Sequence, residues 1–182
     1  MIVLASSSPR RRELLKTAGI DFVIDVEGVE EIPVGNTVAE KVMSLAEQKC
    51  LPVYNRRVDD CVIGADTVVA FDDKILGKPK DKEDAKNMLR MLSGREHCVY
   101  TGVCIAYKGK THIFAEKTAV RFFDLTEKEI EDYVNTNEPM DKAGSYGIQG
   151  LGCTLVESIE GDYFNVVGLP VAKTVRKLRE IL

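Results

Sequence analysis

The chain has 182 residues, 45% of them hydrophobic, which is enough for one substantial core and too few for two comfortable domains. Its formal net charge of −4 argues against a general nucleic-acid or membrane-surface binder, because such proteins carry a basic field over a whole face. The five cysteines are odd in number and lack CxxC spacing, which predicts reduced thiols and no zinc site. No apolar run approaches the roughly 18 residues of a membrane span. We therefore expect one soluble, cytoplasmic domain over residues 1–182, with no nucleic-acid or membrane partner.

The first elements predicted are a short apolar strand over 2–5 and a helix over 9–18. Ser8 as N-cap, Pro9 at the first helical position and Gly19 beyond the last turn are helix start and stop signals. The turn between strand and helix collects serine hydroxyls, free backbone N–H groups and arginines, which suits it to phosphate. A capped helix with a solvated basic face is the alternative. No GxxxxGK[ST] motif occurs, so this is not a Walker loop.

A strand over 22–26 should lead into a loop that contains two adjacent carboxylates, the second of which is Glu31. Thr37 and Glu40 match a capping box, which predicts a helix that ends near Lys49. A lysine in a last turn complements the helix dipole, so Lys49 needs no further explanation unless a phosphate site lies nearby.

The stretch 61–79 departs from a plain core pattern. Asp66 interrupts an apolar run that otherwise favours a strand, and a buried ionised carboxylate is costly unless it is paired. The sequence at 72–74 predicts a hairpin turn, and the return strand 75–76 delivers Lys78 to the same end of the sheet. Asp66 and Lys78 either face one functional site or form an ordinary ion pair at a sheet edge.

The second half of the chain continues the alternation of helices and strands. A mixed, glycine-containing segment over 138–150 has neither helical nor strand period, which is more typical of a binding loop than of a connector. Two hairpins among alternating elements indicate an α/β fold on a mixed sheet. The other elements predicted are a helix over 81–92, a hairpin of strands 98–107 and 111–123, a helix over 126–135, a strand over 151–159, a turn over 161–165 and a helix over 170–181.

Seven blocks of the sequence resemble the Maf family of nucleoside triphosphate pyrophosphatases. They are LASSSPRRRELL at 4–15, VEEI at 29–32, GADTVV at 64–69, LGKP at 76–79, LSGREHCVYTGV at 92–103, EPMDKAGSYGIQG at 138–150 and GDYFNVVGLP at 161–170. The resemblance runs from end to end. It implies a single α/β domain similar to the ITPases, with an elongated twisted mixed sheet, two lobes and a deep cleft between them, in a cytoplasmic protein that is commonly a homodimer.

The resemblance also implies roles for individual residues. Phosphate contacts fall on Ser6, Arg10, Arg11, Lys49 and Lys78. Metal binding and water activation fall on Glu31 and Asp66, and Asp66 is the candidate proton acceptor. The positions that mark the branch specific for dTTP and UTP, as opposed to 7-methyl-GTP, are matched by Arg10, Thr67 and Gln149.

The implied reaction converts dTTP and UTP to nucleoside monophosphate and pyrophosphate, a house-cleaning activity on nucleotide pools for which modified pyrimidine nucleotides are further candidate substrates. A triphosphate carries about four negative charges, so its chemistry calls for positioned cations and a divalent metal, Mg²⁺ or Mn²⁺, with oxygen ligands. Asp66 is a candidate for metal ligation, for base catalysis or for both. The alternatives are a 7-methyl-GTP pyrophosphatase of the same family and a non-catalytic nucleotide sensor that regulates cell division.

Overall fold

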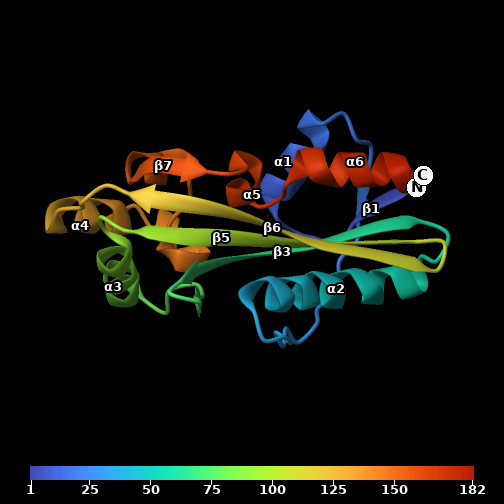
Figure 1. Ribbon diagram of the computed structural model, residues 1–182, viewed down its shortest axis with the longest axis horizontal. Helices are drawn as coiled ribbons and strands as arrows, with labels where there is room; N and C mark the ends of the chain where they lie inside the picture. Colours follow the sequence, from blue (N-terminus) through green and yellow to red (C-terminus); the bar gives the residue numbers. More distant parts are fainter.

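A long twisted sheet forms the frame of the molecule, and both ends of the chain lie at the same end of it (Figure 1). The computed structural model describes all of residues 1–182. The strands are β1 (Ile2–Leu4), β2 (Val23–Ile24), β3 (Cys61–Phe71), β4 (Lys74–Leu76), β5 (Glu96–Tyr107), β6 (Lys110–Phe122) and β7 (Val156–Glu160). Their order is β2-β1-β3-β5-β6-β7, and β4 pairs with β3. Because β1 runs parallel to β2 and β3 while the other pairs are antiparallel, the sheet is mixed, as predicted.

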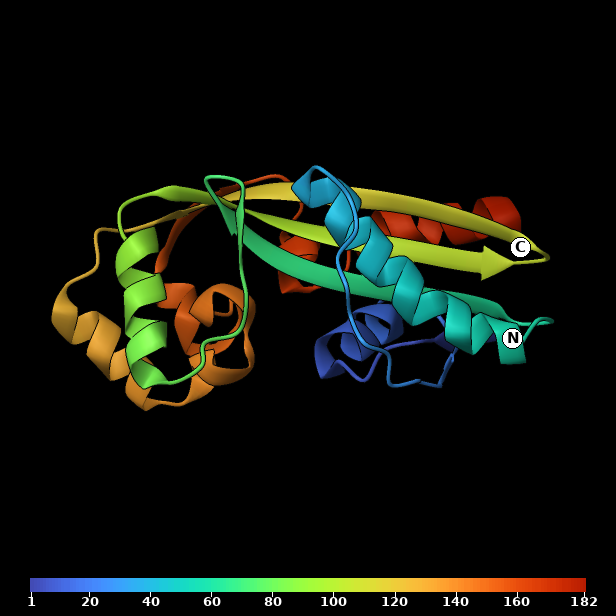
Figure 2. The same ribbon diagram turned by 90° about the horizontal axis from the view of Figure 1, so that it is seen from below.

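Six α-helices cover this sheet: α1 (Pro9–Thr17), α2 (Val38–Arg56), α3 (Lys82–Leu92), α4 (Glu127–Asn135), α5 (Tyr163–Val167) and α6 (Val171–Ile181). Helix α2 lies across one face of the long strands, whereas α1, α5 and α6 lie on the opposite face (Figures 1 and 2). Helices α3 and α4 pack together at the far end of the sheet. The helices therefore divide the molecule into two lobes joined by β3, β5 and β6.

Each lobe has its own hydrophobic core. In the lobe with the chain ends, residues of β3 alternate between the two faces of the sheet: Val62 packs toward α2, and Ile63 packs toward α1 and α6. In the other lobe, Leu89 of α3, Ile130 of α4 and Phe122 of β6 meet in a second core. None of the helices combines the length and the apolar content that a bilayer span requires.

The sequence signals for helix starts and hairpin turns are confirmed. Both capping boxes form, with Thr37 accepting from the Glu40 N–H and Thr126 accepting from the Glu129 N–H, and each glutamate accepting the N-cap N–H in return. Both hairpins form as well, and the turn between β3 and β4 places its two central residues at positive φ, which is the geometry that matches the twist of a hairpin.

Helix α2 is longer than predicted. The sequence placed its end near Lys49, but the helix continues to Arg56 with Pro52 inside it. A proline in a helix interior costs about 3 kcal/mol because it removes one backbone hydrogen bond and crowds the preceding turn. That cost is offset because Cys50 and Val53, on either side of the proline, are fully buried against the sheet.

The prediction for the C-terminal part of the chain was partly wrong. The expected strand over 151–159 is confined to β7, and a 3-10 turn occupies Gly150–Thr154. The N–H groups of Leu151 and Gly152 donate to the Glu138 carboxylate, so they are not available to a strand ladder. The expected turn over 161–165 is the short helix α5, whose first turn is capped by Asp162. Two further 3-10 turns, Glu138–Asp141 and Ala143–Ser145, lie in the predicted loop.

Near the other end of the chain, the strand expected over 22–26 is shorter than predicted and is confined to the two residues of β2.

Two glycines allow α2 to lie unusually close to the sheet. A Cβ on Gly64 of β3 would stand 2.6 Å from the Ala46 carbonyl oxygen, and a Cβ on Gly102 of β5 would stand 2.3 Å from the Val42 carbonyl oxygen. Both contacts are with helix backbone, which cannot move aside cheaply. The close approach brings Lys49, one turn beyond Ala46, to the strand that carries Asp66.

Candidate active site

Two adjoining pockets lie between the lobes. The larger is polar and collects the turn before α1, the loop before α2, and side chains of α2 and β3. The smaller is mostly apolar and lies against the 138–150 segment and α5. The pockets share four lining residues: Arg10, Thr67, Ala143 and Val167. A ligand with a polar and an apolar end can therefore occupy both pockets at once.

The polar pocket opens where β3 has a free edge. Strand β1 pairs with β3 only up to Ile63, and β4 begins to pair with it at Val69. Residues 64–68 of β3 thus have a strand neighbour on one side only, which is β5. Asp66 and Thr67 lie in this gap and line the pocket.

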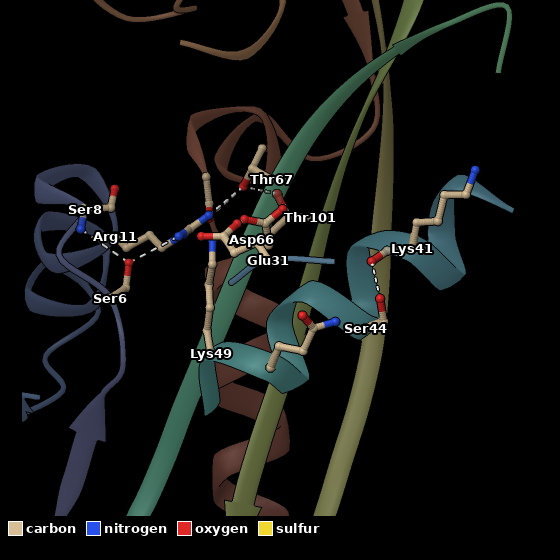
Figure 3. Close-up of polar contacts among 12 residues, drawn as sticks. Ser6, Ser8, Arg11, Glu31, Lys41, Ser44, Lys49, Asp66, Thr67 and Thr101 are labelled. Atoms are coloured by element: carbon tan, nitrogen blue, oxygen red, sulfur yellow. Dashed lines mark hydrogen bonds and ion pairs between the residues drawn. The ribbon is translucent and has the colours of Figure 1, made fainter. Parts of the chain in front are cut away.

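The centre of the polar pocket is a lysine held between two acids (Figure 3). The Lys49 Nζ lies 2.5 Å from Oδ1 of Asp66 and 3.0 Å from Oε2 of Glu31. Asp66 is only 8% exposed, whereas Glu31 is exposed in its loop. The pairing satisfies the requirement that a nearly buried carboxylate have a cationic partner.

The alternative in which Asp66 pairs with Lys78 at a sheet edge is wrong, because its partner is Lys49 of α2. Lys78 lies just beyond β4, is exposed, and lines the same pocket. The two residues therefore face one site, and Lys78 is available to a ligand.

Arg11 ties the turn before α1 to the rest of the site. Its Nε donates to the Gly168 carbonyl at 2.8 Å, Nη1 donates to Ser6 Oγ at 3.2 Å, and Nη2 donates to Thr67 Oγ1 at 3.0 Å. Burial lowers the pKa of Arg11 and the nearby Asp66 opposes that shift, but a guanidinium stays charged in either case. Three of its five N–H groups are used, which leaves two unused.

The turn before α1 has the features expected of an anion site. Ser6 is buried and its Oγ accepts the Ser8 N–H at 3.3 Å, which fixes the backbone just before the helix. Ser8 is the N-cap and Pro9 is the first helical residue, as predicted, but the Ser8 side chain makes no capping hydrogen bond. The N-terminal turn of α1, including Arg10, lines the polar pocket and directs the positive end of the helix dipole toward it.

Thr67 sits at the junction of the two pockets. Its Oγ1 lies 2.9 Å from Thr101 Oγ1 and 3.3 Å from the Gly168 carbonyl, in addition to its bond with Arg11. Thr101 is fully buried and donates to the Asn165 carbonyl at 3.0 Å. The sequence did not single out Thr101, Asn165 or Gly168, although a threonine within an apolar strand was a usable signal.

Gln149 is exposed at the mouth of the apolar pocket. The pocket walls are formed by Val69 of β3, Val99 of β5, Val166 of α5 and the buried ring of Tyr146. All the residues singled out from the sequence thus line one of the two pockets, and Arg10 and Thr67 line both.

The acid pair fits a small divalent cation. Both carboxylates contact the same ammonium group, so one oxygen of each lies within 3.0 Å of Lys49 Nζ and the two acids are close together. No cluster of three or more His, Cys, Asp or Glu side chains exists that could cage a metal by itself. Magnesium commonly uses one or two carboxylates and takes its remaining ligands from phosphates and water, which matches this donor set.

A family model and several relatives each match nearly the whole chain. A family model described as "Maf-like protein" matches residues 1–181. Proteins described as dTTP/UTP pyrophosphatase, from Bacillus cereus (strain G9842) and Bacillus anthracis, are each 53% identical to this chain over 180 residues, which is 98% of this chain and 94% of the relative. One from Bacillus cytotoxicus is 52% identical over 179 residues, with the same coverage.

Two solved structures share the fold. A nucleoside-triphosphatase, described as a dITP/XTP pyrophosphatase, from Mycobacterium abscessus matches with a TM-score of 0.50 at 12% identity, over 98% of this chain and 94% of that one. The Ham1 protein of Staphylococcus aureus matches with a TM-score of 0.50 at 15% identity, over 85% and 79%. At such identities the likeness concerns the fold alone, and it agrees with the predicted ITPase-like architecture.

Proposed function

The chain belongs to the Maf family, and we propose that it hydrolyses dTTP and UTP to the nucleoside monophosphate and pyrophosphate. The observation that carries the proposal is the junction of the two pockets. The polar pocket holds Lys49 between Glu31 and Asp66, and it opens directly into the apolar pocket that Gln149 borders. A nucleoside triphosphate has the same two-part chemistry, with phosphates at one end and a flat base at the other.

Charge balance supports a divalent metal in this reaction. The polar pocket is lined by four basic side chains, Arg10, Arg11, Lys49 and Lys78, and by four acidic ones, Glu27, Glu31, Asp66 and Asp141. A triphosphate would add about four negative charges to a pocket that is already balanced. We propose that Glu31 and Asp66 hold Mg²⁺ or Mn²⁺, which when bound would neutralise developing charge on the phosphates.

The protein's own groups account for the rest of the chemistry. The N-terminus of α1, Arg10, Lys78 and the unused N–H groups of Arg11 would bind and orient the phosphate chain. Asp66 would accept the proton of a water that attacks the α-phosphorus, and pyrophosphate would leave. Lys49 pairs with both carboxylates and would hold them in place until the substrate arrives.

Base selection would depend on Gln149, with Arg10 and Thr67 at the pocket junction. A carboxamide both donates and accepts, which matches the O4 and O2 acceptors and the N3 donor of uracil and thymine. The same edge is present in modified pyrimidines, so these are further candidate substrates. A cytoplasmic homodimer without nucleic-acid partners remains a prediction from the family resemblance.

Hydrolysis in ¹⁸O-labelled water tests the proposal. Purified protein with Mg²⁺ or Mn²⁺ is offered dTTP, UTP, GTP and 7-methyl-GTP, and phosphorus NMR follows the products. We expect dTTP and UTP to give monophosphate that carries the label, together with unlabelled pyrophosphate. Orthophosphate release would place attack at the γ-phosphorus and refute the proposal. Preference for 7-methyl-GTP would assign the other branch of the family, and tight binding without turnover would favour the sensor.

A further inference from the structure

We infer that Glu138 and Tyr133 are positioning residues that set nucleobase selectivity, because they clamp the loop that carries Gln149. The inference rests on the proposed function and deepens it. Neither residue lines the apolar pocket, so neither is a candidate to touch the base. Their effect on the base would be exerted through the loop backbone.

Glu138 holds the far side of this loop. Its Oε2 accepts the Leu151 N–H at 3.0 Å, and its Oε1 accepts the Gly152 N–H at 3.0 Å. A third bond comes from the Tyr133 hydroxyl to Oε1, also at 3.0 Å. One carboxylate therefore fixes two consecutive backbone amides just after Gln149.

Tyr133 holds the near side. It is 5% exposed in α4, and its hydroxyl oxygen accepts the Gly147 N–H at 3.2 Å while its O–H donates to Glu138. Gly147 and Leu151 are each two residues from Gln149, one before it and one after it. The exposed Gln149 is thus carried on a short span between two points that the same pair of side chains secures.

The loop is built to fit this clamp closely. A Cβ on Gly152 would stand 2.7 Å from the Tyr133 hydroxyl and 2.1 Å from the Gly147 carbonyl oxygen. Gly150, at φ +66°, would bring a Cβ to 2.8 Å from Glu138 Oε2. The glycines around Gln149 therefore let the backbone wrap around the two side chains, which gives them a role besides access for the base.

The chemistry of the clamp favours a charged carboxylate. Burial raises the pKa of Glu138, but the hydrogen bonds from Leu151, Gly152 and Tyr133 together lower it by more than burial raises it, so the net shift is downward. The ammonium of Lys142, which lines the apolar pocket, donates to the Glu138 backbone carbonyl at 2.6 Å and anchors the start of the segment. A neutral amide in place of the carboxylate has only one acceptor oxygen, so it would set an NH₂ group against a backbone N–H.

Binding measurements on four proteins test the inference. Wild type, Glu138→Gln, Tyr133→Phe and the control Glu180→Gln are titrated with the α,β-imido analogues of UTP and GTP by calorimetry. Glu180 lies on α6 and pairs with Lys177, away from both pockets. We expect the UTP-to-GTP affinity ratio to fall roughly tenfold in Glu138→Gln and less in Tyr133→Phe, with no change in the control. An unchanged ratio in both clamp variants would overturn the inference.

A double-mutant cycle separates positioning from general damage. In a Gln149→Ala background, Glu138→Gln should change the affinity ratio no further, because its effect would pass through the missing side chain. A further fall of the same size would refute action through Gln149. Hydrogen exchange supplies an independent readout: the amides of Leu151 and Gly152 should lose protection in Glu138→Gln, and retained protection would show that no clamp exists.

These experiments distinguish failure of the inference from failure of the proposed function. Binding of the imido analogues requires no turnover, so a protein that does not release pyrophosphate from UTP would refute the function and still report on the clamp. If the wild type prefers another base, the cycle is run with that base. If the wild type bound all bases equally, there would be no base selectivity for Glu138 and Tyr133 to set, and the inference would be refuted.

Discussion

Replacement of Asp66 with Asn separates its chemical role from its structural one. The change keeps the size of the side chain and one oxygen that can still accept from Lys49 Nζ, now 2.5 Å from Oδ1. It removes the charge that metal binding or proton acceptance requires. Lys49 is left with a partner in either case, because Glu31 remains 3.0 Å away.

The two roles predict effects of different size. Loss of a general base typically costs at least ~10²-fold in rate, which corresponds to about 2.7 kcal/mol of activation free energy. The cost in stability is smaller, since the ion pair with Lys49 becomes a hydrogen bond from a charged donor to a neutral amide, and the difference is about 1 kcal/mol. For a domain of this size, that lowers the melting temperature by roughly 2 to 4 °C.

Pyrophosphate release from UTP and urea unfolding are measured side by side on Asp66→Asn and on a matched control, Asp60→Asn. Asp60 lies outside both pockets of the candidate site and pairs with the N-terminal amine at 3.0 Å and with Arg57 at 3.2 Å. The control should lose similar stability and no turnover. Near-normal turnover of Asp66→Asn would refute the catalytic role and leave Asp66 as an ion-pair partner of Lys49.

Three further predictions concern the surroundings of the site. Gly102→Ala should lower the free energy of unfolding in urea by about 1 to 3 kcal/mol, because its methyl group overlaps α2 backbone; an unaffected midpoint would contradict the packing. The Gln48 side chain accepts the Ile32 N–H at 3.1 Å and donates to the Ile32 carbonyl at 2.7 Å, which fixes the backbone next to Glu31. Gln48→Ala should therefore reduce turnover in the wild type but cause no further loss in a Glu31→Ala background, and additive losses would show that Gln48 does not act through Glu31. Burial lowers the pKa of His97 to about 4, so the native state binds fewer protons than the unfolded state between pH 6.5 and 4. Roughly 3 kcal/mol of stability should therefore be lost as the pH falls through that window. His97→Gln should show a shallower loss in urea titrations, and an identical slope would exclude His97 as the source.

Features whose sequence signals lie within a few residues of one another were predicted correctly. The capping boxes at Thr37 and Thr126, the proline start of α1 and the hairpin turns all form, because each depends on backbone groups close in the chain. The acid in the middle of β3 was also recognised as exceptional from its apolar neighbours alone. Such features need no knowledge of the tertiary structure.

Features that depend on distant partners were missed or misplaced. The partner of Asp66 is Lys49, 17 residues away on α2, and their meeting depends on how closely the helix packs on two strands. The end of α2 was placed too early because burial beyond Pro52 outweighs a local penalty. The Glu138 clamp breaks the predicted strand at 151–159 from 13 residues away. In each case tertiary contact decided against a local preference.

The free edge of β3 explains how one pocket can use both faces of a sheet. Successive residues of a strand point to opposite faces, so Asp66 faces α2 and Lys49, while Thr67 faces Arg11 of α1. In the middle of a sheet these groups would be separated by neighbouring strands. Because β1 ends before this point and β4 begins after it, the edge of β3 is open over 64–68, and both side chains line the same pocket. The short length of β1 and the late start of β4 therefore bring the acids of one face and the turn before α1 on the other face to a single pocket.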